Sequence, residues 1–129
     1  MKQIFLAIAA LTAFCLSTSA QNDLLSPDGT YMYERRDTCD LFMDVYNPAE
    51  GSEDTFMGVR KPTVVFMFGG GFIQGTRDDK SYNSWFRMLT ENGYRVISID
   101  YRLGLKGATK VGVAQVNLLD KAIHMAVED

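Results

Sequence analysis

An apolar run that ends in three consecutive glycines constrains this chain more than any other feature of its sequence. Residues 62–68 read PTVVFMF, and Gly69, Gly70 and Gly71 follow directly. The run is too short for a stable helix and does not alternate with polar residues, which predicts a strand buried on both faces. Such strands are typical of parallel sheets covered by helices, where ligands bind beyond the carboxyl ends of the strands. We therefore expect a binding loop immediately after this strand.

The glycines suit a loop that a ligand approaches through the main chain alone. Without side chains, their N–H groups are unobstructed and their backbone is free to adopt positive φ. This arrangement favours recognition of an anion by backbone donors. The alternative is a tight turn with no ligand, and the choice between the two depends on the rest of the chain.

Three stretches together resemble the α/β-hydrolase esterases and lipases. Residues 68–72 read FGGGF, which is similar to the family's His-Gly-Gly-Gly loop with Phe68 in place of histidine. Residues 41–48, LFMDVYNP, resemble an early strand of the family. Residues 96–104, VISIDYRLG, resemble the next strand and its Asp-Tyr-Arg-Leu ending. Their occurrence in the right order over residues 31–104 makes the resemblance specific.

The resemblance implies an α/β fold, the N-terminal part of an α/β-hydrolase domain in which an antiparallel hairpin precedes a parallel βαβ unit. It also implies a serine esterase that hydrolyses carboxylic esters, of small molecules or carbohydrates, through an acyl-enzyme and without cofactor or metal. The family's glycine loop donates N–H groups to the oxyanion, and the matching positions are Gly70 and Gly71. Gly69 is expected to let the backbone turn, and Phe68 to replace a polar tether by packing.

The nucleophile, acid and base of such an enzyme are not found in these residues. No Gly-x-Ser-x-Gly sequence occurs, and His124 is the single histidine. The family order is serine, acid, histidine, so His124 and Asp100 both come too early in the chain. We expect an exposed helical position for His124 and structural roles for Asp100 and Arg102. The chain is expected to be truncated before the nucleophile elbow and inactive on its own.

Two other functions remain open at this point. A catalytically inactive hydrolase-like binding protein would carry the same residues here. A dinucleotide-binding module is less well supported, because its third glycine is required where Gln74 stands and its helix should begin at the loop.

Residues 1–20 resemble a signal peptide, which predicts a secreted or periplasmic protein whose mature domain spans residues 21–129. Lys2 precedes an apolar run at residues 4–16, and small residues lead to a cleavage site after Ala20. The run is shorter than the ~20 residues that span a bilayer, so no stable membrane anchor is expected. The net charge of −3 gives no indication of nucleic-acid binding. Cys39 is expected in a hairpin turn, either free or paired with a cysteine outside this chain.

The remaining pattern predicts the elements around the glycine loop. We expect hairpin strands at residues 30–35 and 41–46, a solvated loop at 49–61, and a strand at 94–100. A helix is expected over residues 82–91, with Ser81 as its N-cap and Asn92-Gly93 as its stop. A second helix begins near residue 111. Its predicted apolar face comprises Val113, Val116, Leu119, Ile123, Ala126 and Val127.

Overall fold

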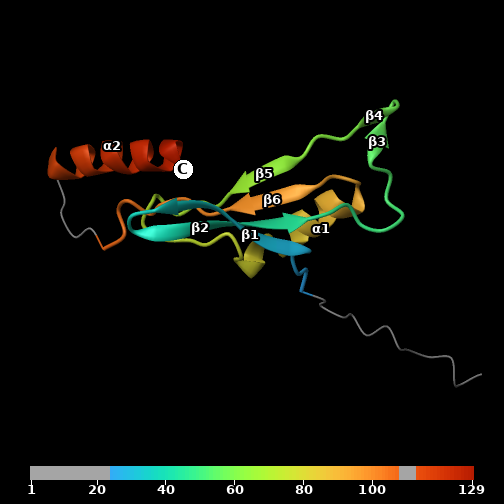
Figure 1. Cartoon of the computed structure of the whole chain (residues 1–129), viewed down its shortest axis with the longest axis horizontal. Helices are drawn as coiled ribbons and strands as arrows, with labels where there is room; N and C mark the ends of the chain where they lie inside the picture. Colours follow the sequence, from blue (N-terminus) through green and yellow to red (C-terminus); the bar gives the residue numbers. More distant parts are fainter. Residues whose placement is uncertain (1–23, 108–112) are drawn as a thin grey trace, which may run out of the picture.

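The computed structural model describes residues 24–107 and 113–129. Its centre is a four-stranded sheet in the order β1-β2-β6-β5 (Figure 1). A separate two-stranded hairpin, β3-β4, projects from one end of the sheet (Figure 1). The elements are β1 (Gly29–Arg36), β2 (Cys39–Tyr46), β3 (Thr55–Phe56), β4 (Val59–Arg60), β5 (Val64–Met67), the 3₁₀ turn η1 (Lys80–Tyr82), α1 (Asn83–Glu91), β6 (Val96–Ile99) and α2 (Val113–Glu128).

The predicted order of an antiparallel hairpin and a parallel βαβ unit is confirmed. β1 pairs antiparallel with β2, and β2 pairs antiparallel with β6. β5 and β6 are parallel, and α1 connects them along the chain. A tight turn reverses the direction of the chain and so joins antiparallel strands. Parallel neighbours therefore require a longer crossover, here through α1. The carboxyl ends of β5 and β6 consequently lie at the same edge of the sheet.

The core lies between α1 and one face of the sheet. Tyr46, Phe86 and Val96 are buried there, and the rings of Tyr46 and Phe86 lie 5.1 Å apart. Phe66 meets Phe86 edge-to-face at 5.0 Å. Aromatic pairs prefer these tilted arrangements, which bring the positive ring edge toward the negative ring face. This packing holds β5, and with it the start of the glycine loop, against the helix.

The expected stop of α1 is confirmed, whereas its expected N-cap is wrong. Gly93 has a φ of 79°, and the amides of Gly93 and Tyr94 bond to the carbonyls of Thr90 and Leu89 at 2.9 and 3.0 Å. This is the Schellman pattern that glycine favours. At the other end Ser81 is not the N-cap. It lies within η1, where its amide donates to the Asp79 carboxylate at 2.8 Å, and α1 begins two residues later at Asn83.

The strand before the glycines is not buried on both faces, contrary to expectation. Val65 is 60% exposed and Met67 is 51% exposed, while Val64 and Phe66 face the core. Within the described residues β5 pairs with β6 alone, so it forms an edge of the sheet. The strand is therefore apolar on both faces, but the face with Val65 and Met67 is not covered by the described residues.

Two loop expectations also need correction. Residues 49–61 contain the β3-β4 hairpin, whose turn has positive φ at both Met57 (52°) and Gly58 (78°), as tight hairpins require. Cys39 is not in the β1-β2 turn but is the first residue of β2, opposite Arg36. Its thiol is free and exposed in the part of the chain that the structure describes.

The apolar face predicted for α2 is not the face by which the helix packs on the rest of the protein. Val116 and Val127 are 66% and 78% exposed, whereas Ala122 is fully buried. Ala122 lies against Gly104, where an added Cβ would come within 2.8 Å of it. Figure 1 shows α2 past the carboxyl ends of β5 and β6 rather than across the sheet. Of the predicted face, Leu119 and Ile123 are also exposed, Ala126 is half-buried, and the side chain of Val113 lies outside those described.

Candidate active site

The glycine loop leaves the carboxyl end of β5 in a conformation that only glycine adopts readily. Gly70 and Gly71 have φ values of 142° and 62°. The carbonyl of Gly70 accepts from the amides of Ile73 and Gln74 at 3.1 and 3.4 Å, which closes a turn. An added Cβ at Gly70 would lie 1.8 Å from the Gln74 carbonyl oxygen. The turn therefore excludes a side chain at position 70, both by its φ and by this close approach.

The same turn leaves two backbone donors available. Gly70 and Gly71 are both exposed. Within the described residues, neither amide donates a hydrogen bond to another protein group. An added Cβ at Gly71 would meet nothing within 4 Å, so other protein groups do not crowd this residue. The two predicted site residues thus present adjacent N–H groups at the carboxyl edge of the sheet.

Phe68 anchors the beginning of the loop by packing, the interaction expected of this replacement. It is 4% exposed, and its ring stacks on Tyr101 with centroids 4.5 Å apart. Gly75 approaches so closely that a Cβ there would lie 2.4 Å from the Phe68 ring. The loop therefore folds back over its own first residue, and Gly75 is needed for that closure.

Tyr101 binds the loop at two further points. Its hydroxyl donates to the Phe68 carbonyl at 2.8 Å, and its ring meets Phe72 edge-to-face at 5.8 Å. Burial raises the pKa of Tyr101, with a smaller contribution from Tyr82, so the hydroxyl keeps the proton that it donates. The Leu105 amide also donates to the Phe72 carbonyl at 2.9 Å. The segment after β6 therefore contacts the glycine loop on several sides.

A charged cluster holds the far end of the loop. The Arg77 guanidinium lies between two carboxylates, with Nη1 donating to Asp100 at 2.7 Å and Nε 3.2 Å from Asp44. The Nε contact is close enough for an ion pair but is not aligned as a hydrogen bond. Asp44 is 2% exposed and also accepts from the Thr30 hydroxyl at 2.5 Å. The Ser98 hydroxyl donates to the Arg77 carbonyl at 2.8 Å.

The charges of this cluster favour the protonated, charged form of Arg77. Burial disfavours the guanidinium, but Asp100 and Asp44 outweigh it, so the pKa of Arg77 is raised. Its guanidinium also lies 5.5 Å from the centre of the Phe42 ring. Sequence reasoning missed this cluster. The available signal was Asp44, a carboxylate inside an apolar strand, because such a group requires a buried partner.

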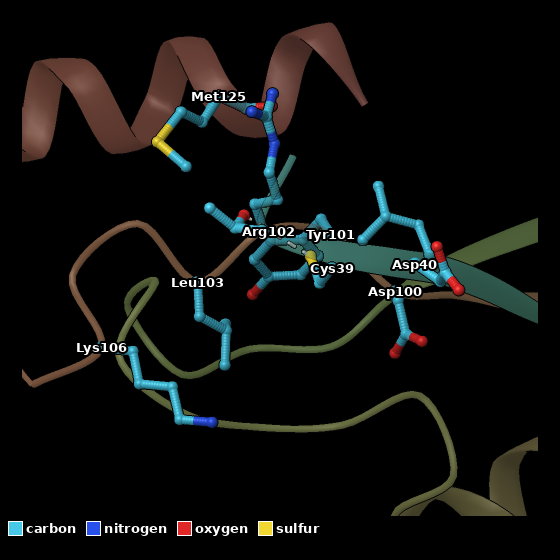
Figure 2. Close-up of a pocket in the computed structure, with 10 residues that line it drawn as sticks. Cys39, Asp40, Asp100, Tyr101, Arg102, Leu103, Lys106 and Met125 are labelled. Atoms are coloured by element: carbon cyan, nitrogen blue, oxygen red, sulfur yellow. Dashed lines mark hydrogen bonds between the residues drawn. The ribbon is translucent and has the colours of Figure 1, made fainter. Parts of the chain in front are cut away.

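A cavity of about 370 Å³ opens beside Tyr101, between the β1-β2 turn and α2 (Figure 2). Arg102 lies at its α2 side, and Cys39 and Lys106 are also among its lining residues. Arg102 donates to the buried Asp129 carboxylate through Nε at 2.7 Å and to the Met125 carbonyl at 2.9 Å. These bonds join the segment after β6 to the end of α2. The predicted role of Arg102 as a paired structural cation is confirmed.

Comparison with known proteins decides the family. The BD-FAE family model matches residues 43–125, a span that includes the second half of β2, the glycine loop, β6 and most of α2. This chain belongs to the BD-FAE family. That family is an esterase-type group of α/β-hydrolases, which confirms the resemblance seen in the sequence.

The BD-FAE chain is also similar to parts of larger proteins. It is 35% identical over 74 residues to the non-reducing polyketide synthase ausA of Emericella nidulans, covering 57% of this chain and 3% of the synthase. It is 31% identical over 91 residues to liver carboxylesterase B-1 of Rattus norvegicus, covering 70% of this chain and 15% of that enzyme. The chain thus spans a small part of the length of these relatives.

Among solved structures, the BD-FAE chain resembles the apo form of Thermogutta terrifontis esterase 2. The TM-score is 0.46 at 21% sequence identity, and the alignment covers 76% of this chain and 37% of that chain.

The other residues considered as candidates lie where structural roles were expected. His124 is exposed on α2, with its Nε2 3.6 Å from Asp120. The Asp100 carboxylate accepts hydrogen bonds from Arg77 at 2.7 Å and from the Phe42 amide at 3.3 Å. Among the described residues, no group of three or more His, Cys, Asp or Glu side chains is placed to hold a metal ion. None of the helices described is long and apolar enough to cross a membrane.

The geometry of the BD-FAE loop differs from that of a dinucleotide site. Such a site places the pyrophosphate at a helix N-terminus that begins in the glycine turn. Here the polar link that contains Arg77, and then η1, separate the glycines from α1, which begins at Asn83. The glycine amides are therefore not placed at a helix N-terminus.

Proposed function

We propose that the protein containing this BD-FAE chain is a serine esterase that hydrolyses carboxylic esters through an acyl-enzyme. One observation carries the proposal: Gly70 and Gly71 present adjacent, exposed amides without protein partners in the described structure. They lie at the carboxyl end of a strand in a parallel βαβ unit, where ligands of such sheets bind. Membership of an esterase-type family supports the same reaction.

In this proposal the glycine loop forms part of the oxyanion hole. When a nucleophile attacks the ester carbonyl, its oxygen becomes negatively charged and accepts hydrogen bonds from Gly70 and Gly71. Removing one such donor typically costs about 2.7–4 kcal/mol of transition-state stabilisation. The serine, acid and base would come from residues outside this sequence, since it contains no Gly-x-Ser-x-Gly elbow.

The natural substrate is proposed to be a small-molecule or carbohydrate-linked ester, encountered outside the cytoplasm. The support for export is the sequence of residues 1–20, which lie outside the described residues. N-terminal sequencing of the secreted or periplasmic protein should begin at Gln21. Recovery of the protein from the cytosol with Met1 retained would contradict export and leave the proposed reaction untouched.

The reaction is tested by placing side chains on the glycine loop of the full-length protein. With p-nitrophenyl acetate as substrate, Gly70→Val should lower kcat about 100-fold or more and change KM little, because the donors act mainly in the transition state. Gly71→Ala tests the second position. An added Cβ there meets open space, but the φ of 62° strains any residue with a side chain, so kcat should fall because the strained backbone moves the N–H group.

Gly69→Ala is the matched control for both substitutions. Contrary to the expectation that Gly69 lets the backbone turn, its φ lies outside the left-handed region, and an added Cβ there meets nothing within 4 Å. This variant should therefore keep kcat within about twofold. Circular dichroism should show that all three variants are folded. A folded Gly70→Val protein with an unchanged kcat would place the oxyanion hole elsewhere.

A further inference from the structure

We propose that Arg77 is a positioning residue that sets the glycine loop against β6, an inference that rests on the proposed esterase function. The loop leaves the sheet at Phe68 and returns to it at Arg77. Each end is fixed by residues at the end of β6 or just after it. The two exposed donors, Gly70 and Gly71, lie between these fixed points.

The two ends are held by different kinds of contact. At the start, Tyr101 contributes a stacked ring and a hydroxyl that donates to the Phe68 carbonyl at 2.8 Å. At the return, Asp100 accepts from Arg77 Nη1 at 2.7 Å, and the Ser98 hydroxyl donates to the Arg77 carbonyl at 2.8 Å. Ser98, Asp100 and Tyr101 follow one another closely along β6 and its end.

The side chain of Arg77 has little freedom to leave this position. It is 20% exposed, and its guanidinium pairs with Asp44 as well as with Asp100. Asp44 is almost fully buried on β2, so removing the arginine would leave a buried carboxylate without its counter-charge. A planar guanidinium bridges two carboxylates in a fixed geometry, which a lysine ammonium does not reproduce.

Rigid anchoring at both ends matters for the proposed reaction. A displacement of about 1 Å in a catalytic group can lower a rate about 100-fold. The loop between the anchors is rich in glycine, and glycine restrains the backbone less than any other residue. The internal turn of the loop, closed on the Gly70 carbonyl, preserves its local shape but does not place it relative to the sheet. The structure assigns that placement to Arg77 and Tyr101 at the two ends, beside the bond from the Leu105 amide to the Phe72 carbonyl.

The test compares Arg77→Gln and Arg77→Lys in the full-length protein, with kcat expressed per active site titrated by diethyl p-nitrophenyl phosphate. Titration removes the contribution of unfolded molecules. For p-nitrophenyl acetate, kcat per site should fall at least tenfold in Arg77→Gln, with KM within twofold, and Arg77→Lys should recover part of the loss. Asp100→Asn, which keeps the size of the side chain, should behave like Arg77→Gln if the latter does not fold.

Arg60→Gln is the matched control, because Arg60 pairs with Asp54 at 3.4 Å on the exposed β3-β4 hairpin. It should leave kcat per site within twofold. A second readout needs no activity. The Leu105 amide donates to the Phe72 carbonyl at 2.9 Å and so reports contact between the loop and the segment after β6; its hydrogen exchange should be at least tenfold faster in Arg77→Gln than in the wild type. Unchanged kcat per site together with unchanged exchange would overturn the positioning role.

The two proposals fail in different ways. If Gly70→Val keeps its kcat, the oxyanion assignment is wrong, and the exchange measurement still tests whether Arg77 holds the loop. If Gly70→Val loses kcat while folded Arg77→Gln and Asp100→Asn keep theirs, the oxyanion assignment stands and the role of Arg77 is refuted.

Discussion

The Tyr101 hydroxyl donates a 2.8 Å hydrogen bond to the main-chain carbonyl of Phe68, the residue immediately before the three glycines. The two rings are stacked as well, so Tyr101 both bonds to the start of the loop and covers it. In this BD-FAE chain the buried ring of Phe68 is covered by Tyr101.

Tyr101→Phe separates the hydrogen bond from the stacking. The ring remains in place, so the variant should lose about 1 kcal/mol of unfolding free energy, the net value of a typical hydrogen bond. If the bond also positions the loop, kcat for p-nitrophenyl acetate should fall more than KM rises. Urea denaturation and steady-state kinetics of the full-length protein measure the two effects. Tyr31→Phe, on an exposed side chain, is the control and should change neither.

Removing Asp44 should destabilise the protein far more than removing an exposed partner of an ion pair. Asp44→Ala leaves Arg77 with one carboxylate and the Thr30 hydroxyl without its acceptor. We expect a loss of about 3 kcal/mol, at the low end for a broken buried pair because Asp100 remains. Asp40→Ala breaks the exposed pair with Arg35 and should cost less than about 1 kcal/mol. Equal losses in urea denaturation would show that the Asp44 cluster is not stabilising.

Stability should decline at alkaline pH because several tyrosines are held protonated in the folded state. Burial is the main cause that raises the pKa of Tyr33, Tyr46 and Tyr101 above the usual value of 10.0. Above about pH 10 the unfolded chain releases these protons first and binds fewer of them than the folded chain. The free energy of unfolding therefore falls as pH rises from 10 toward the folded-state pKa values, whereas below 10 this contribution is fully present.

Urea midpoints at pH 8.5 and 11, with tyrosinate absorbance near 295 nm, test this prediction. The Tyr101→Phe variant should show a smaller decline than the wild type, since one of the linked groups is gone. A urea midpoint that stays constant across this range would contradict it. So would a difference in absorbance between the wild type and Tyr101→Phe that rises with an ordinary tyrosine pKa before unfolding.

The exposed edge at β5 should cause residues 21–129, expressed alone, to associate. Val65 and Met67 are more than half exposed on a strand that is paired on one side in the described structure. Unpaired apolar edges recruit further strands. Val65→Lys combined with Met67→Lys should shift sedimentation toward the monomer. Glu50→Lys, an exposed charge change elsewhere, should not. The fragment is also expected to be inert toward p-nitrophenyl acetate, and serine-dependent hydrolysis by it would refute that expectation.

Features determined by neighbouring residues were predictable from the sequence of this BD-FAE chain. The hairpin, the βαβ unit and the glycine stop of α1 follow from alternation, apolar runs and glycine, which act within a few residues. The turn at Gly70 belongs to the same class, because its closing bonds reach no further than Gln74. The N-cap of α1 was misplaced because Ser81 lies in the 3₁₀ turn η1, which Asp79 caps, and Tyr82 precedes the helix.

The tertiary structure decided which surfaces meet and which charges pair. Arg77 finds its partners on β2 and at the end of β6, and the buried face of α2 is chosen by Ala122 against Gly104 rather than by its apolar stripe. Such contacts join residues far apart in the chain, and no local pattern encodes the distance between them. The sequence by itself determined that a glycine loop follows an apolar strand. The fold decided that Tyr101 and Arg77 hold its two ends, because only packing brings β6 beside both.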